Sequence, residues 1–292
     1  MGRAAILTDP QAVVTSRQHV AMLTDLSECI GCKACEVACK QWDQNEAETT
    51  TFLGSYQSHP GIVDNTWTVI QFVENIDEQR DMSIASWEFL KRNCMHCTEA
   101  GCVTACPVDA LTYGELGTVD FHPERCIGCG YCQQGCPFEA IDVRAQLFDT
   151  DKKAGKCSFC IDRITNGMAP ACVQTCPTDC IKYGSRDDLI RWGRQRVEQL
   201  KARGFTNATL YGENELGGLH QLYVLLDSPD KYGLPVDPKV SPTLKFIRSV
   251  VYPVGKFLLG ATLFGLLINF FASRNLEAAH TSGKASTGAA QS

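Results

Sequence analysis

The sequence lacks the short motifs that mark the common catalytic and nucleotide-binding sites. It has no glycine-rich Rossmann or Walker loop and no Ser/His/Asp motif. Residues 1–18 contain neither the apolar run of a secretory signal nor paired arginines. The net charge of −6 gives no support to nucleic-acid binding, since proteins that bind phosphate backbones carry basic patches. We therefore expect no nucleic-acid partner, and no active site is evident.

Cysteine, by contrast, is abundant: the chain has 17, and 16 of them form four runs of four. The runs are Cys29, Cys32, Cys35, Cys39; Cys94, Cys97, Cys102, Cys106; Cys126, Cys129, Cys132, Cys136; and Cys157, Cys160, Cys172, Cys176. The first and third have the C-x2-C-x2-C-x3-C spacing of two-cluster ferredoxins, where three thiolates hold one cluster and the fourth reaches another. Four runs predict four [4Fe–4S] clusters.

The residues beside these cysteines suit tightly curled cluster loops. Glycines between ligand cysteines permit unusual backbone angles and close approach of amides to the cluster; they are Gly31, Gly128 and Gly130. Proline follows the fourth cysteine in three runs, where it can turn the chain away, but Lys40 takes that place in the first run. The fourth run has a wide gap between Cys160 and Cys172, so its third ligand comes from a longer loop.

Two other interpretations of the cysteines are disulfides and structural zinc. Disulfide scaffolds are typically small domains without a core, whereas 292 residues at 44% hydrophobic can bury one. Zinc sites usually consist of two C-x2-C pairs separated by a dozen residues or more, whereas these cysteines come in fours. The spacing favours iron–sulfur clusters over both.

The segments around the runs predict an α+β fold of two ferredoxin-like units with two clusters each. Strands are expected at 110–113, 118–121, 140–143, 181–183 and 221–226, and a helix at 185–203 with Ser185 and Asp188 as a capping pair. One unit, residues 90–148, contains runs two and three; the other, 20–40 and 150–227, contains runs one and four. The whole cluster domain is 20–227, after an N-terminal arm at 1–19.

The C-terminal part predicts a membrane anchor. Residues 228–245 are rich in proline and indicate an extended arm rather than a domain. Phe257–Ser273 carries no charge, and with the residues before it the segment exceeds the ~30 Å thickness of bilayer hydrocarbon at ~1.5 Å per residue. A buried core helix is the alternative. We predict one transmembrane helix at 246–273 and a disordered tail at 274–292.

Longer stretches of the sequence resemble a known family. The runs CIGCKACEVACKQW, CMHCTEAGCVTACP, CIGCGYCQQGCPF and CSFCIDRITNGMAPACVQTCP are similar to those of the iron–sulfur β subunit of membrane-bound respiratory formate dehydrogenases of the N and O type. The resemblance covers about residues 20–275. It includes KARGF at 201–205, GGLHQLYVL at 217–225 and YGLPVDPK at 232–239. The cluster motifs alone would also fit β subunits of nitrate and dimethyl sulfoxide reductases.

The resemblance implies a crossed assignment of ligands to four sites. Site 1 takes Cys29, Cys32, Cys35 and Cys176; site 2 takes Cys39, Cys157, Cys160 and Cys172; site 3 takes Cys94, Cys97, Cys102 and Cys136; site 4 takes Cys106, Cys126, Cys129 and Cys132. No ligand position holds Trp or Asp, so nothing indicates a three-iron cluster.

The resemblance also implies a function and partners. The chain would relay electrons from a molybdopterin catalytic α subunit, with molybdenum or tungsten, to a cytochrome b γ subunit and quinone. The alternatives are a β subunit of another molybdopterin oxidoreductase, an autonomous enzyme and a zinc-stapled interaction module. Basic residues before the span weakly favour an internal domain, but the positive-inside rule loses force for large translocated domains. We predict a single-pass protein of the bacterial inner membrane with its cluster domain on the periplasmic side.

Two further residues lie inside or beside the runs without a ligand position. His96 stands between Cys94 and Cys97, and we expect it to tune a cluster rather than ligate it, because four thiolates already serve that site. Cys180 is the cysteine outside the runs, and we expect a buried apolar thiol.

Overall fold

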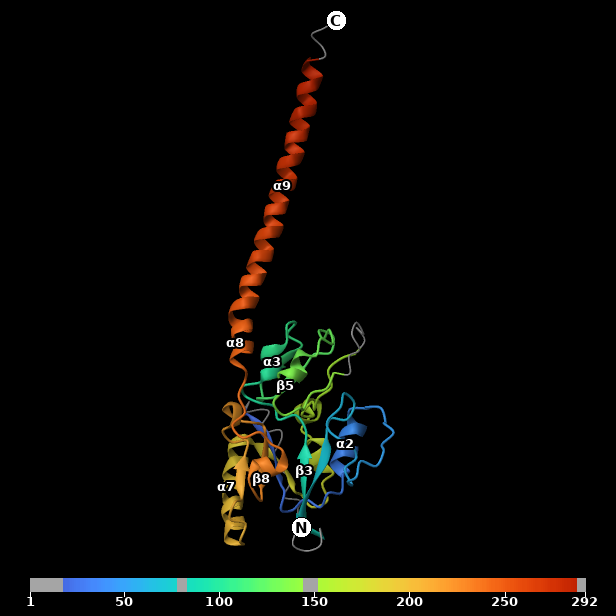
Figure 1. Cartoon of the computed structure of the whole chain (residues 1–292), viewed down its shortest axis with the longest axis vertical. Helices are drawn as coiled ribbons and strands as arrows, with labels where there is room; N and C mark the ends of the chain where they lie inside the picture. Colours follow the sequence, from blue (N-terminus) through green and yellow to red (C-terminus); the bar gives the residue numbers. More distant parts are fainter. Residues whose placement is uncertain (1–17, 78–82, 144–151, 288–292) are drawn as a thin grey trace. The chain divides into compact units, whose positions relative to one another are not determined.

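The computed structural model of the chain describes residues 18–77, 83–143 and 152–287 (Figure 1). The chain divides into two units, one ending at Ser241 and the other beginning at Pro242. Most of the expected N-terminal arm, residues 1–17, lies outside the described residues. The first unit contains all the cysteine runs, and the second is helical.

A four-stranded sheet joins the first and fourth cysteine runs. Its order is β6 (Ile181–Ser185), β1 (Val20–Asp25), β8 (Gln221–Leu225) and β7 (Thr209–Tyr211). β1 pairs antiparallel with β6 and parallel with β8, and β7 pairs antiparallel with β8. The strand that leads into the first run therefore lies beside the strand that leaves the fourth, and the predicted strands at 181–183 and 221–226 are confirmed.

Alternating side chains of β1 separate a helix side of this sheet from a cysteine side. Leu23 belongs to the core that includes Leu189 and Leu200 of α7 (Arg186–Ala202), a helix that Figure 1 shows alongside β8. Met22 faces the other way, and its Sδ lies 3.6 Å from the Sγ of Cys172. The sheet thus covers part of the iron–sulfur region from water.

The predicted helix at 185–203 is confirmed in α7, but its predicted capping pair is wrong. The side chain of Ser185 makes no capping hydrogen bond. Asp188 instead accepts a hydrogen bond from Arg191 one turn further along the helix, so its carboxylate is not available to complete a capping box.

A long hairpin fills the cysteine-free stretch between the first and second runs. β2 (Val69–Asp77) pairs antiparallel with β3 (Ser83–Arg92). The Phe89 ring occupies the space beside Gly31, where an added Cβ would lie 2.7 Å from the ring. The hairpin therefore packs over the first run, whose last two cysteines lie on α2 (Ala34–Trp42).

The second and third runs lie on two short helices whose backbones touch. α3 (Gly101–Ala105) carries Cys102, and α4 (Tyr131–Gln134) carries Cys132. A Cβ at Gly101 would lie 2.2 Å from the carbonyl oxygen of Gly135, so the close approach requires glycine at position 101. Between these helices in the chain, β4 (Leu111–Tyr113) pairs antiparallel with β5 (Val119–Phe121), which confirms the predicted strands at 110–113 and 118–121.

The predicted strand at 140–143 is wrong: the structure has a single bridge there, between Asp142 and Gly155. Side chains take the place of a partner strand. The backbone N–H of Ala140 donates to the Sγ of Cys136, and that of Val143 donates to the side-chain oxygen of Gln133. Because these donors are already bonded, no regular ladder forms.

In the fourth run, Cys160 directly precedes α5 (Ile161–Thr165) and Cys172 lies on α6 (Ala171–Gln174). The chain after this run includes two 3-10 helices, η1 (Glu215–Gly217) and η2 (Pro229–Tyr232). The proline-rich segment, expected to be an extended arm, packs against the first unit. Tyr232, Leu234 and Val240 are buried in a core that includes Met95, and the hydroxyl of Tyr211 donates to the carbonyl of Pro235 at 2.8 Å. Apolar residues between the prolines therefore bind the arm to the first unit as far as Ser241.

The second unit is helical along all of its described length. α8 (Pro242–Phe246) passes through a π-helical turn, η3 (Ile247–Val251), into α9 (Tyr252–Thr287). Pro253 explains the turn, because its ring clashes with the carbonyl four residues earlier and it has no N–H to donate. Residues 242–274 include an 18-residue stretch with a mean hydropathy of 1.7, none of it buried, so the helix is long and apolar enough to cross a bilayer.

The helix begins and ends beyond the predicted limits of 246–273. It starts at Pro242, inside the expected arm, and it continues to Thr287, where a disordered tail was expected from 274. Residues 275–279 are Asn, Leu, Glu, Ala and Ala, and three of these types are strong helix formers, which favours continuation of the helix. Residues 288–292 of the predicted tail lie outside the described residues.

Candidate metal centres

Each cysteine run repeats one backbone feature between its first two cysteines. The residue before the second cysteine is left-handed in every run: Gly31, His96, Gly128 and Phe159, with φ of 65°, 47°, 67° and 58°. This conformation curls the loop so that backbone amides can point toward a cluster. Two of the four are glycines, for which it carries no steric penalty.

The two non-glycine residues at this position support one another. His96 and Phe159 are both fully buried, and their rings meet edge to face with centroids 4.8 Å apart. Nδ1 of His96 accepts a hydrogen bond from the backbone N–H of Val119 at 3.0 Å, and burial lowers the pKa of His96 well below its usual value. His96 is therefore neutral and holds the second and fourth runs against β5; its tuning of a cluster stays a prediction.

A second repeated feature follows the fourth cysteine of runs two, three and four. The third residue after it is left-handed, at Asp109, Glu139 and Asp179, with φ of 52°, 52° and 53°. The next backbone N–H then points at the cysteine: Ala110 donates to Cys106 Sγ at 3.2 Å and Ala140 to Cys136 Sγ at 3.5 Å. Such amides stabilise negative charge on the sulfur.

The structure brings the cysteines predicted for site 3 together. Burial raises the pKa of the Cys97 thiol well above its usual range, and the next three causes are the neighbouring thiols of Cys94, Cys102 and Cys136. These four come from two different runs, as the crossed assignment requires.

Site 4 shows the same crossing. Burial raises the pKa of Cys132 to about 12, and Cys126, Cys129 and Cys106 are the neighbouring thiols that raise it further. All four also line one cavity. Cys106 thus lies with the third run although it belongs to the second.

Site 2 combines the last cysteine of the first run with three of the fourth. Burial raises the pKa of Cys39, with Cys157 and Cys172 as neighbours that raise it further. Burial also raises the pKa of Cys160, and Cys172 and Cys157 again follow as causes. All four cysteines of site 2 are buried.

Site 1 contains an additional thiol. One cavity is lined by Cys29, Cys32, Cys35 and Cys176, and also by Cys180. The Sγ of Cys180 lies 3.4 Å from the Sγ of Cys176. A hydrogen bond with Cys180 is the largest cause that lowers the pKa of Cys176, to about 5. The expectation of a buried thiol is correct, but its surroundings are other cysteines as well as apolar side chains.

Cys180 could have been found from the internal repeat. It occupies the fourth position after Cys176, where the second and third runs have Ala110 and Ala140 after their fourth cysteines. Because those alanines point their amides at a cysteine, a side chain at the same position in the fourth run is expected to face the same site.

Neighbouring thiols of different sites give the order of the sites. Cys172 of site 2 raises the pKa of Cys35 of site 1. Cys94 of site 3 raises the pKa of Cys157 of site 2, and Cys132 of site 4 raises the pKa of Cys102 of site 3. These neighbouring pairs indicate the order 1, 2, 3, 4 for the predicted sites.

The two ends of this series reach the surface. Cys32 of site 1 and Cys129 of site 4 are exposed, whereas every cysteine of site 2 is buried and those of site 3 are buried or partly buried. Exposed apolar residues flank both exposed cysteines: Ile30 at one end, and Ile127 and Tyr131 at the other.

The residues fit [4Fe–4S] clusters. Thiolate is the form that binds metal, yet buried neighbouring thiols raise one another's pKa, so a group of four can ionise together only around a cationic core. Among the residues that the structure describes, no three His, Cys, Asp or Glu side chains converge as ligands of a single ion would. A cluster instead offers a separate iron to each thiolate. The assignment of each ligand to its cluster stays a prediction.

Two buried lysines among the sites were not anticipated from the sequence. Lys91 is 1% exposed and Lys156 is 2% exposed. Lys91 lines the site 1 cavity, and both appear among the charges that act on the ligand cysteines. Neither belongs to a motif, although Lys156 directly precedes Cys157.

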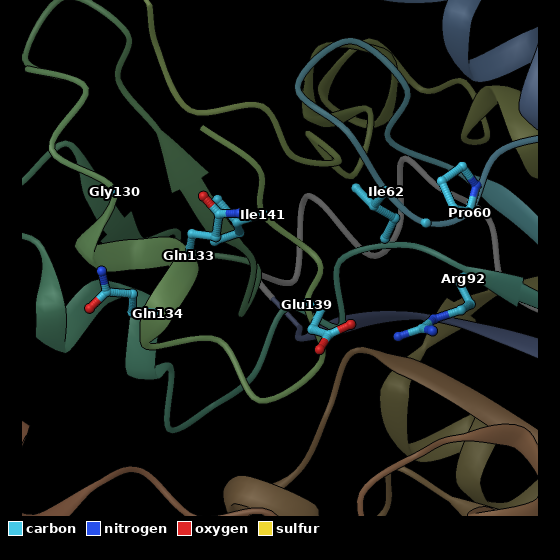
Figure 2. A pocket seen from close by; sticks show the side chains of 9 residues that line it. Pro60, Ile62, Arg92, Gly130, Gln133, Gln134, Glu139 and Ile141 are labelled. Atoms are coloured by element: carbon cyan, nitrogen blue, oxygen red, sulfur yellow. The ribbon is translucent and has the colours of Figure 1, made fainter. Parts of the chain in front are cut away.

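One open cavity near these sites contains no cysteine. It measures about 590 Å³ and includes Pro60, Ile62, Arg92, Gln133 and Glu139. Figure 2 shows the Arg92 side chain pointing toward Glu139 across it. Arg92 also donates to the carbonyl of Phe138 at 3.1 Å. With no ligand cysteine and no buried unpaired charge at its wall, it presents no metal-binding chemistry.

Comparison with known proteins agrees with the cysteine geometry. Residues 85–186 match a family model described as a 4Fe-4S dicluster domain, and residues 28–110 match a second model with the same description. Together the matches span all four cysteine runs. The chain is thus an iron–sulfur protein with ferredoxin-type dicluster domains, in a mixed α/β fold.

The chain is also similar to curated proteins along most of its length. The iron–sulfur subunit of the nitrate-inducible formate dehydrogenase of Escherichia coli K12 is 39% identical over 268 residues, 90% of this chain and 88% of the relative. The formate dehydrogenase-O iron–sulfur subunit of the same organism is 39% identical over 258 residues, 87% of this chain and 83% of the relative. A thiosulfate reductase electron transfer subunit of Salmonella typhi is 34% identical over 205 residues, 69% of this chain and 95% of the relative. The chain therefore belongs to the family of iron–sulfur electron-transfer subunits of formate dehydrogenases.

Proposed function

We propose that this chain conducts electrons through four [4Fe–4S] clusters, from the molybdenum- or tungsten-containing catalytic subunit of a formate dehydrogenase to a membrane cytochrome b and quinone. The observation that carries the proposal is the ordered series of four cysteine sites with one exposed cysteine at each end. A conductor between two partners needs this arrangement: surface access at the ends and burial between them.

The chain's own residues would hold the clusters and shield them from water. Each bound cluster accepts one electron and passes one on, and the cysteines hold it in place. The sheet strand β1 and the hairpin residue Phe89 cover sites 1 and 2, and the backbone amides of Ala110 and Ala140 face ligand sulfurs. Burial and these hydrogen bonds set the potential of each cluster.

The two ends suit different partners. By its family resemblance, the catalytic subunit would dock at site 1, where Ile30 and Val37 are exposed beside Cys32. The cytochrome would dock at site 4, beside Ile127 and Tyr131. Exposed apolar side chains at a redox end suit partner binding, because they are covered when the partner docks.

We further propose that residues 242–274 anchor the chain in the bacterial inner membrane, with the cluster unit on the periplasmic side. The apolar length of the helix and its unburied surface support an anchor. Gly260, Ala261 and Gly265 would let a cytochrome helix approach closely.

A β subunit of another molybdopterin oxidoreductase is the second candidate, since a thiosulfate reductase subunit also matches. Purification of the complex from its native host decides between them. We expect about sixteen irons per chain, a broad absorption band bleached by dithionite, and formate-dependent dye reduction. Bound zinc without colour, or dye reduction with another substrate and none with formate, would overturn the proposal.

A further inference from the structure

Lys91 and Lys156 each lie at a junction between two cluster sites. The charge of Lys91 lowers the pKa of Cys35 in site 1 and of Cys172 and Cys157 in site 2. The charge of Lys156 lowers the pKa of Cys157 in site 2 and of Cys94 and Cys102 in site 3. Lys91 thus lies near cysteines of sites 1 and 2, and Lys156 near cysteines of sites 2 and 3.

Both ammonium groups are held by neutral oxygens. Nζ of Lys91 donates to Oδ1 of Asn93 at 2.8 Å, and Nδ2 of Asn93 lies 4.0 Å from the Sγ of Cys157. Nζ of Lys156 donates to the backbone carbonyls of Val119 at 2.6 Å and Cys157 at 2.8 Å. In the described parts of the chain, neither lysine forms an ion pair with a carboxylate.

A buried charge without an opposite charge is strongly destabilising. Arg196, whose side chain is 11% exposed, has such a partner: it pairs with Asp25 at 2.7 Å. Lys91 and Lys156 lie instead among ligand cysteines, whose thiolates would supply the negative charge once clusters are bound. Lys91 lines the site 1 cavity together with Cys29, Cys35 and Cys176.

We infer that Lys91 and Lys156 are fixed positive charges that raise the reduction potentials of the two clusters flanking each of them, and so keep sites 1, 2 and 3 reducible in series. The inference rests on the proposed function, because it requires clusters at these sites. A positive charge favours the reduced form of a neighbouring cluster, which carries one more negative charge than the oxidised form. The electron itself passes from one cluster to the next, and the lysines gain or lose nothing.

The test is a redox titration of the purified complex, monitored by EPR, with Lys91→Met and Lys156→Met. Single-ligand variants at each site assign the signals. Lys91→Met is expected to lower the midpoints of sites 1 and 2 by about 59 mV or more, a tenfold change in the equilibrium constant of a one-electron couple. Lys156→Met is expected to lower sites 2 and 3 similarly. Site 4 is the internal reference in both.

Lys201→Met is the matched control, because it removes the same charge from the surface of α7, where Lys201 pairs with Glu198 at 3.2 Å. It should shift no midpoint. Unchanged midpoints in the two buried variants at full iron content would overturn the inference, as would an equal shift of all four sites. If Lys91→Met loses iron, Lys91→Gln keeps a hydrogen bond to Asn93. Iron loss in both would make the lysine a structural support and reject the tuning role.

Failure of the proposed function is distinguishable from this. Wild-type complex without [4Fe–4S] spectra or formate-dependent dye reduction would reject the function, whatever the lysine variants do. Wild-type complex with both, but with insensitive midpoints in the variants, would reject only the role of the lysines.

Discussion

At the scale of single residues, position 180 shows how one side chain distinguishes the fourth run from the others. The corresponding positions are alanine in the second and third runs, where the backbone alone donates to a ligand sulfur. Cys180 adds a thiol 3.4 Å from Cys176. A donor to a ligand sulfur stabilises its negative charge and favours the reduced cluster.

Cys180→Ala is therefore expected to leave the iron content at about sixteen per chain and to lower the midpoint of site 1 alone. The shift should be smaller than that caused by removing a full charge at Lys91. Iron analysis and an EPR titration measure both quantities. Cys180→Ser, which keeps a donor, is the control and should lie closer to wild type. A fall to about twelve irons would show that Cys180 is itself a ligand.

A ligand cysteine should behave in the opposite way. Cys102 has Cys94, Cys136 and Cys132 as its neighbouring thiols, all in sites 3 and 4. Cys102→Ser is expected to remove the site 3 cluster, about four irons, and to keep the signals of sites 1 and 2, whose ligands come from other loops. Iron analysis with reduced-state EPR of the complex measures this. Loss of all four clusters from a folded complex would contradict independent sites.

The sequence indicates most of each predicted cysteine group because three of its four ligands come from one run. The fourth ligand comes from another run, and the family resemblance, rather than spacing, predicts which one it is. Lys91 and Lys156 could not be predicted in this way. Lys91 reaches the sites from β3, more than fifty residues after Cys35, and a lone lysine carries no spacing signal.

At the scale of elements, the contact between α3 and α4 depends on the absence of a side chain. A Cβ at Gly101 would lie 2.2 Å from the carbonyl oxygen of Gly135, a distance that only a backbone shift can relieve. Gly101→Ala is expected to destabilise the complex by about 2 kcal/mol and to loosen clusters at sites 3 and 4 first. Thermal unfolding and iron retention on dilution measure the effect.

Gly61→Ala is the matched control, because a Cβ there meets nothing within 4 Å and its backbone is not left-handed. It should be neutral within ~0.5 kcal/mol. Equal stability of the two variants would mean that the helices can separate without loss, and that their contact does not position the ligands.

The sequence predicts a helix or strand correctly where its pattern is local. It fails where hydrogen bonding to another segment determines whether a strand forms. β4 and β5 follow an alternating pattern around a tight turn, and α7 has apolar residues at helical spacing. The β2–β3 hairpin was not predicted, because its pairing partners are separated by a segment without a turn motif. Residues 140–143 have strand-like side chains, but their donors bond to Cys136 and Gln133 instead.

At the scale of the whole molecule, the boundary between the units lies later than composition indicates. Prolines suggest a linker from 228, yet Tyr232 and Val240 are buried in the first unit. Only tertiary packing reveals this, because proline content reports local stiffness and not contacts. The first unit therefore needs the chain up to Ser241, and the apolar helix follows directly.

Truncation after Ser241 is expected to separate electron conduction from membrane attachment. All the ligand cysteines and the buried arm remain, so the shortened chain should keep about sixteen irons, and the complex should still reduce an artificial dye with formate. It should be washed from membranes by carbonate more readily and should reduce quinone poorly, because the anchoring helix no longer packs against the cytochrome. Truncation after Thr287 is the control, since it leaves residues 242–274 intact, and it should behave as wild type. Full quinone reduction by the Ser241 truncation, with undiminished resistance to washing, would show that the helix neither anchors the chain nor aligns site 4 with its electron acceptor.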